Sequence, residues 1–183
     1  MLADANEEVW VKLDDLLRDP KRVSKVMGGG TAEAETIMKQ IYCDLVTLPS
    51  SKAALKQLYT TLALAGSTPA ILHCSSGKDR TGWATAALLT LLGVPKETVI
   101  NDFLRSNEYI LPQYKKTIDD FVKAGGEPGI PPAILGVKAS YLEAAFNEAK
   151  RVYGSMERYF SEGLGLDTTT QKKLKELLLV QKN

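Results

Sequence analysis

Cysteine and histidine are scarce in this chain, and the shortage argues against two classes of protein. The sequence holds two cysteines, Cys43 and Cys74, and one histidine, His73. Two cysteines are too few for a disulfide-stapled scaffold. A metal centre needs several histidine, cysteine or acidic ligands at a recognisable spacing, and the sequence shows no such cluster. We therefore predict neither a metal nor another cofactor.

Charge of one sign is lacking as well. The 23 Lys and Arg residues almost balance the 22 Asp and Glu residues. Nothing in that balance predicts nucleic acid or a membrane surface as a partner, so any anion site must be built locally. No segment reaches the ~18 apolar residues of a membrane span, and residues 1–8 lack the basic and apolar regions of a signal peptide. The compartment stays open between cytoplasmic and secreted.

What the sequence does contain is helical periodicity over most of its length. Helices are expected from Asp4 to before Pro20, from Thr31 through Leu45, from Ser50 or Ser51 through Leu62, from Thr81 to Leu92 and after Pro95. Further helices should begin near Leu111, near residues 136–140, at Ser155, and at Asp167 or Thr168. Residues 125–132, rich in glycine and proline, predict a long loop. The short apolar segment Ala70–His73 predicts a buried strand.

These elements predict an α/β fold in one domain, residues 1–183. The fold should be helix-rich, and its central sheet appears truncated in this chain because a lone strand is not a stable sheet. An unfinished sheet has an exposed edge, which predicts a partner or self-association.

The segment after the predicted strand, residues 74–80, has the pattern of a phosphate-binding loop. It runs Cys-Ser-Ser-Gly-Lys-Asp-Arg into a helix. Backbone N–H groups of residues 75–80 can surround a tetrahedral dianion, and the helix N-terminus adds its own. Gly77 permits the tight backbone path, and Arg80 can place two donors on two phosphoryl oxygens. The predicted substrate-binding residues are Ser75, Ser76, Gly77, Lys78 and Arg80.

Cys74 is the predicted nucleophile. A thiol at a helix N-terminus beside Arg80 should be a thiolate near neutral pH. It would attack phosphorus and form a cysteinyl-phosphate that water hydrolyses, with Thr81 easing departure of the sulfur. A bare Cys-x5-Arg pattern is weak evidence, and a buried cysteine in an ordinary turn is its alternative; the apolar segment before it and Thr81-Gly82 after it make the pattern specific. A nucleotide-binding loop is disfavoured because Asp79 follows Gly77-Lys78.

Three neighbours keep open roles. His73 suggests a general base, but a supporting role that orients the loop and tunes the thiolate is favoured. Lys78 adds a charge at the pocket mouth that suits substrates with several phosphates, or is a solvated lysine. Asp79 must point away from the phosphate, donate a proton, or pair with Lys78. We count it with Cys74, Arg80 and Thr81 as a candidate catalytic residue.

The string from His73 to Gly82 resembles the loop of bacterial tyrosine phosphatases of the type secreted by mycobacteria and Listeria. The resemblance continues through residues 101–107, 135–142 and 153–155 and covers roughly residue 36 to the C-terminus. It implies hydrolysis of phosphotyrosine, often of phosphoserine and phosphothreonine, and of phosphoinositides.

One departure from that family bears on the mechanism. Its members have several strands before this region and an Asp in an Asp-Leu-Arg-like segment, proposed as general acid. This chain has no such segment upstream of the loop. Either it is the C-terminal part of a longer domain, or another copy completes its sheet. The general acid is unassigned, since the helical context of Asp44 favours a surface role. The alternative function is a non-catalytic module that binds phosphorylated ligands or a partner.

Overall fold

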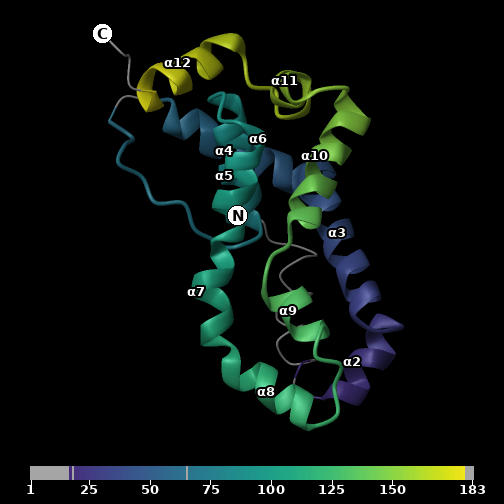
Figure 1. Ribbon diagram of the computed structural model, residues 1–183. Helices are drawn as coiled ribbons and strands as arrows, with labels where there is room; N and C mark the ends of the chain where they lie inside the picture. Colours follow the sequence, from purple (N-terminus) through teal and green to yellow (C-terminus); the bar gives the residue numbers. More distant parts are fainter. Residues whose placement is uncertain (1–16, 18, 65, 180–183) are drawn as a thin grey trace.

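We describe the protein from a computed structural model, which covers residues 17, 19–64 and 66–179. Within these ranges the chain forms helices joined by loops, and no strand is present (Figure 1). The elements are α2 (Pro20–Met27), α3 (Thr31–Thr47), α4 (Pro49–Leu62), α5 (Arg80–Leu91), α6 (Lys96–Leu104), α7 (Ser106–Gln113), α8 (Lys115–Lys123), α9 (Ile130–Leu135), α10 (Ala139–Tyr153), α11 (Met156–Arg158), the π-helix η1 (Tyr159–Gly163) and α12 (Thr168–Leu178). The helix expected between Asp4 and Pro20 lies outside the described residues, except for positions 17 and 19.

Capping residues explain where several of these helices begin. The backbone N–H of Gly30, just before α3, donates to the Glu33 carboxylate at 2.9 Å. The Asp167 side chain, just before α12, accepts a hydrogen bond from the Thr170 backbone N–H at 2.6 Å. Such bonds satisfy N–H groups that have no partner inside the helix. The predicted helix starts at Thr31 and at Asp167 or Thr168 are confirmed.

Two helix positions differ from the prediction. The helix expected near Leu111 begins earlier, at Ser106. The loop expected over residues 125–132 is shorter, because α9 begins at Ile130. Pro131 and Pro132 lie in the first turn of α9, where an N–H group would have no intrahelical acceptor in any case.

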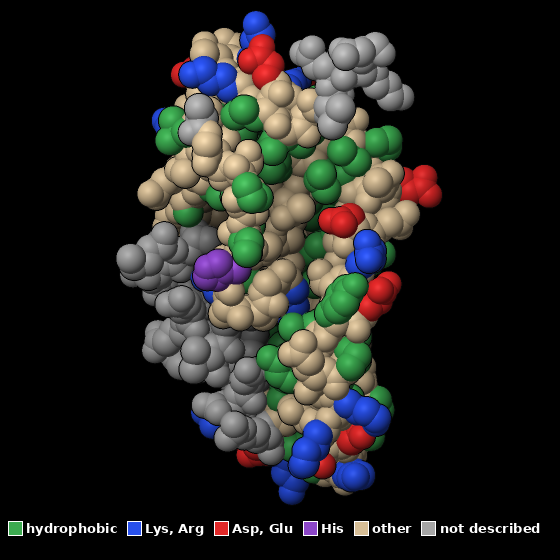
Figure 2. Space-filling view, turned by 90° about the vertical axis from the view of Figure 1, so that its left-hand side faces the viewer, with side chains coloured by type: hydrophobic (Ala, Val, Ile, Leu, Met, Phe, Trp, Pro, Cys, Tyr) green, Lys and Arg blue, Asp and Glu red, His purple; other side chains and the backbone are tan. Residues whose placement is uncertain are grey.

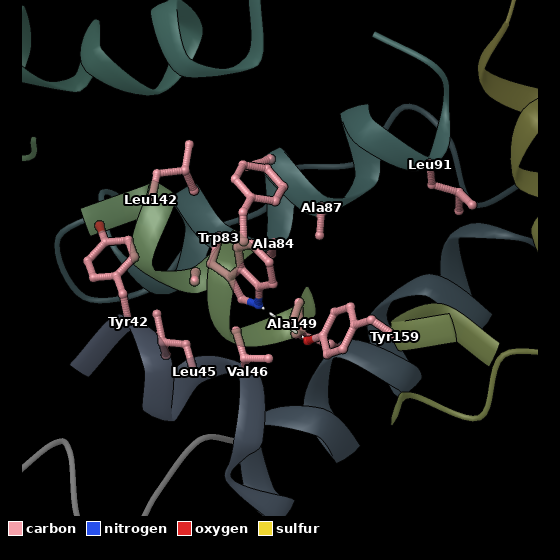
Figure 3. Packing of buried hydrophobic residues seen from close by; sticks show 14 of the residues in the cluster. Tyr42, Leu45, Val46, Trp83, Ala84, Ala87, Leu91, Leu142, Ala149 and Tyr159 are labelled. Atoms are coloured by element: carbon pink, nitrogen blue, oxygen red, sulfur yellow. Dashed lines mark hydrogen bonds between the residues drawn. The ribbon is translucent and has the colours of Figure 1, made fainter. Parts of the chain in front are cut away.

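The main core is built around Trp83 of α5. Its ring packs against Phe146 of α10 and Tyr159 of η1, with centroids 5.5 and 5.7 Å apart. The indole N–H donates to the Tyr159 hydroxyl at 3.3 Å. Figure 3 shows side chains of α3, α5 and α10 converging on this ring. A second cluster lies at the other end of α3, where Phe121 of α8 contacts the buried side chains of α9. Both clusters contain side chains of α3, so this long helix connects the two cores. Figure 1 shows α3 extending from α2 to the region of α10.

The predicted strand at Ala70–His73 is not formed in the described part of the chain. Residues 67–73 run between α4 and the start of α5 with no regular structure. Ile71 is 91% exposed, and no backbone hydrogen bond ties residues 69–73 to other described residues. An apolar run favours extended backbone, but it becomes a buried strand only when neighbouring strands pair with it. The helix-rich part of the fold prediction is confirmed, and a central sheet is not found among the described residues.

None of the described helices is long and apolar enough to cross a membrane.

Candidate active site

The phosphate loop, residues 74–80, joins the irregular segment to the first turn of α5. Gly77 has φ +72°, a left-handed conformation that side chains other than glycine rarely adopt. A Cβ atom at this position would meet nothing within 4 Å. Glycine is therefore required here by the backbone conformation and not by lack of room.

The Cys74 sulfur lies at the inner side of this loop, half-buried. It accepts a hydrogen bond from the Gly77 backbone N–H at 3.2 Å. The hydroxyl of Thr81 also faces the sulfur, without the geometry of a full hydrogen bond, and no other described group partners this buried oxygen. Burial opposes the charged form, but the contacts from Thr81 and Gly77 and the charge of Arg80 outweigh it and lower the pKa of the Cys74 thiol. The loop thus stabilises a thiolate at this position.

Arg80 and Ser75 lie on the same side of the loop as the sulfur. The Arg80 guanidinium donates to the Ser75 hydroxyl at 2.8 Å. Together with Cys74 and His73 they line a hollow of about 570 Å³. The rest of its wall is largely apolar and includes Leu55 and Leu58 of α4. Figure 2 looks onto this region of the surface, where hydrophobic side chains gather above the purple histidine. The arrangement brings a thiolate, a guanidinium and an apolar wall to one cavity.

Two residues of the loop itself, Lys78 and Asp79, have buried side chains. Their exposed fractions are 4% and 3%, and they are the charged side chains among the described residues that are buried to this degree. The Lys78 ammonium lies 2.7 Å from an Asp79 carboxylate oxygen and donates to the backbone carbonyls of Ile134 and Gly136 at 3.1 and 3.3 Å. Both expectations for Lys78, a charge at the pocket mouth and a solvated lysine, are therefore wrong. Of the three alternatives for Asp79, the structure shows the pair with Lys78.

His73 and Ser76 are exposed on the loop. No hydrogen bond or ion pair of His73 with other described residues is found, so its supporting role stays a prediction. Asp44 lies on α3, where it accepts a hydrogen bond from Gln40 at 2.9 Å, and it does not line the hollow. The general acid stays unassigned.

The second cysteine, Cys43, is a free thiol on α3. Its sulfur lies 3.8 Å from the Ala144 carbonyl oxygen of α10. Burial, with the nearby Glu148 and Asp44 carboxylates, raises the pKa of the Cys43 thiol. The pKa values of the Cys43 and Cys74 thiols are therefore shifted in opposite directions. Within the described ranges, no group of three or more His, Cys, Asp or Glu side chains is placed to hold a metal ion.

Tyr42 is the residue near the loop that sequence reasoning missed. It lies on α3, is fully buried, and donates its hydroxyl hydrogen to Asp79 at 2.9 Å. In the sequence it is one more large residue at helical spacing, which is typical of an ordinary core position. Only the tertiary structure places its hydroxyl under the loop.

Most of this chain is similar in sequence to known proteins. Residues 4–180 match a sequence model described as the tyrosine phosphatase family. The triple specificity protein phosphatase PtpB of Mycobacterium tuberculosis is 29% identical over 158 residues, which are 80% of this chain and 56% of that protein. A tyrosine-protein phosphatase of Nostoc commune is 29% identical over 133 residues, 70% of this chain and 45% of that protein. The chain thus spans about half the length of these two relatives.

Proposed function

The chain belongs to the tyrosine phosphatase family, and from that premise we propose that it hydrolyses phosphate monoesters, phosphotyrosine first among them, through Cys74. The observation that carries the proposal is the placement of the Cys74 sulfur, with its lowered pKa, in the same hollow as Arg80 and Ser75. A thiolate beside a guanidinium and a ring of backbone N–H groups is suited to attack on a phosphoryl group.

The reaction has two displacements at phosphorus. In the first, the Cys74 sulfur forms a bond to phosphorus, and the bond between phosphorus and the ester oxygen breaks. The ester oxygen leaves with the electron pair of that bond, as a phenolate or alkoxide, and takes a proton from solvent. In the second, water attacks phosphorus, the S–P bond breaks, and inorganic phosphate leaves while the thiolate is restored. We assign Arg80 and the N–H groups of residues 75–80 to the phosphoryl oxygens, and Thr81 to the departing sulfur.

The apolar wall of the hollow favours an aryl ester. The partly exposed side chains of Leu58 and Leu72 offer an aromatic ring a surface on which apolar area is removed from water. A phenolate leaves with little protonation, whereas an alkoxide needs an acid. Phosphotyrosine is therefore the substrate that this site suits best.

Phosphoserine, phosphothreonine and phosphoinositides are further proposed substrates. The name of the M. tuberculosis relative states a triple specificity, which supports testing more than one class. In this chain the wider range does not rest on Lys78, because that side chain is buried and paired with Asp79.

The test is steady-state hydrolysis of para-nitrophenyl phosphate by the chain, by Cys74→Ser and by Arg80→Ala, with reductant and without added metal. Turnover that both substitutions abolish is the expected result. Vanadate binding is measured on the same three proteins. If the chain binds vanadate but does not hydrolyse the ester, it is a non-catalytic module that binds phosphorylated ligands. If it shows no vanadate binding and no hydrolysis, both functions are refuted.

We also propose that the exposed segment around Ile71 mediates self-association. Ile71 is 91% exposed and lies at the edge of the apolar hollow, next to backbone that makes no hydrogen bond with described residues. Backbone N–H and C=O groups without partners in the described part of the chain can pair with an extended segment of a second copy. A solution mass above that of one chain, returned to one chain by Ile71→Lys, is expected. A wild-type chain that is monomeric at high micromolar concentration would refute the proposal.

A further inference from the structure

The phosphate loop is held from below by a hydrogen-bonded chain that begins in α3. The Tyr42 hydroxyl donates to one oxygen of the Asp79 carboxylate at 2.9 Å, and the Lys78 ammonium lies 2.7 Å from the other oxygen. Lys78 in turn donates to two backbone carbonyls at the end of α9. Both oxygens of this buried carboxylate therefore have a donor, one from α3 and one from within the loop.

The Tyr42 ring is itself fixed on two sides. It packs edge-on against Phe103 of α6 and tilted against Tyr141 of α10, with centroids 5.9 and 5.8 Å apart. Burial, and then the charge of Asp79, hold the pKa of Tyr42 well above its ordinary value. The hydroxyl consequently keeps its proton and acts as a donor across the working pH range. A rigid ring with a permanent donor is a fixed support for the carboxylate above it.

Asp79 links this support to the groups that face the hollow. It immediately precedes Arg80. Its backbone carbonyl accepts a hydrogen bond from the backbone N–H of Trp83 at 2.8 Å, in the first turn of α5. A buried carboxylate without its donors is strongly disfavoured, so Asp79 cannot rotate or shift without losing them. The position of its side chain thus fixes the backbone from which Arg80 and the last N–H groups of the loop project.

We propose that Tyr42 is a positioning residue of the phosphate loop: by holding the Asp79 carboxylate, its hydroxyl sets the geometry in which the loop receives a tetrahedral oxyanion. The inference rests on the proposed function of the loop and deepens it. It also gives Asp79 the role of a buttress beneath the loop, directed away from the hollow, and not that of a proton donor to the leaving group.

The test compares Tyr42→Phe with Tyr59→Phe. Tyr59 is an equally buried tyrosine, on α4, whose hydroxyl donates to a backbone carbonyl, that of Ala84, at 2.8 Å. Each substitution removes one buried hydroxyl and keeps its ring. Vanadate affinity and the pH dependence of Cys74 alkylation by iodoacetamide are measured for both, with Cys74 and Cys43 distinguished by mass spectrometry. Melting temperatures report the general loss of stability.

Tyr42→Phe is expected to weaken vanadate binding by about tenfold or more, as for loss of a hydrogen bond to a charged group, and to move Cys74 alkylation to higher pH. Tyr59→Phe should lower the melting temperature by a similar amount and leave both other readouts near wild type. Equal effects of the two substitutions on vanadate and alkylation would overturn the proposal. Measurements on the wild type separate this proposal from the proposed function of the chain. If Cys74 of the wild type is alkylated at low pH but the protein neither binds vanadate nor hydrolyses substrate, the proposed function fails. The alkylation of Tyr42→Phe and Tyr59→Phe then still tests the role of Tyr42.

A double-mutant cycle with Asp79→Asn tests the route of the effect. If Tyr42 acts through Asp79, the loss of vanadate affinity on Tyr42→Phe should shrink several-fold when Asp79 is already changed. Additive losses would refute action through that carboxylate.

Discussion

Replacing Lys78 with methionine should destabilise the protein far more than an ordinary loop substitution. Methionine keeps the length and packing of the side chain but removes its charge. Asp79, 3% exposed, would then be left in the interior with Tyr42 as its remaining donor among the described side chains. The carbonyls of Ile134 and Gly136 would lose the Lys78 donor. Removing one partner of a buried ion pair costs about 3–5 kcal/mol. For a chain of this length that corresponds to a fall in melting temperature on the order of 10 °C.

The matched control is Lys116→Met, which removes the lysine of an exposed pair with Asp120 on α8. The Lys116 side chain is 88% exposed, so no change in melting temperature beyond experimental scatter is expected. Urea unfolding of both variants, followed by far-UV circular dichroism, gives the two free energies on one scale. If Lys78→Met proved no more destabilising than Lys116→Met, the buried pair would not stabilise the loop as argued.

A second variant separates loss of charge pairing from loss of packing. Lys78→Met combined with Asp79→Leu removes both charges, and it should be more stable than Lys78→Met alone because no unpaired carboxylate stays buried. Recovery should be incomplete, since the Tyr42 hydroxyl loses its acceptor, at a cost of roughly 1–3 kcal/mol. A double variant that is less stable than the single one would contradict the electrostatic explanation.

Three further predictions concern the loop and the core. Gly77→Ala should lower the free energy of unfolding by about 1–2 kcal/mol, because the penalty at φ +72° is conformational and not steric; a neutral result in urea unfolding would contradict the left-handed conformation. Iodoacetamide should label Cys74 at lower pH than Cys43, since the pKa of the Cys74 thiol is lowered and that of the Cys43 thiol is raised. Phosphatase activity should likewise rise with pH over the acidic range in which Cys74 loses its proton. Labelling of Cys43 before Cys74 would refute the assignment. Trp83→Ala should cost about 3–5 kcal/mol, because the ring is 1% exposed at the centre of the main core; a melting temperature near wild type would show that the core packs without it.

Several helix boundaries and the phosphate loop can be predicted from local sequence. Helix boundaries such as Thr31 and Asp167 follow from capping and from apolar spacing over three and four residues, which depend on neighbours along the chain. The same holds for the phosphate loop. A cysteine, a glycine that can adopt positive φ, and an arginine at the start of a helix lie within seven consecutive residues, so their chemistry is local.

What the sequence leaves undecided is whatever depends on a distant partner. The apolar run around Ile71 has the composition of a buried strand, yet burial requires neighbouring strands, and the described residues provide none. Lys78 and Asp79 are charged residues, and charged residues usually lie at the surface. They are buried because they pair with each other, and because Tyr42 and the carbonyls at the end of α9, far away in the sequence, supply the further hydrogen bonds. The sequence by itself determined the chemistry of the loop, because that chemistry lies in adjacent residues; only the tertiary structure decided which of its side chains face the substrate and which support it from below, because side-chain direction is set by contacts across the fold.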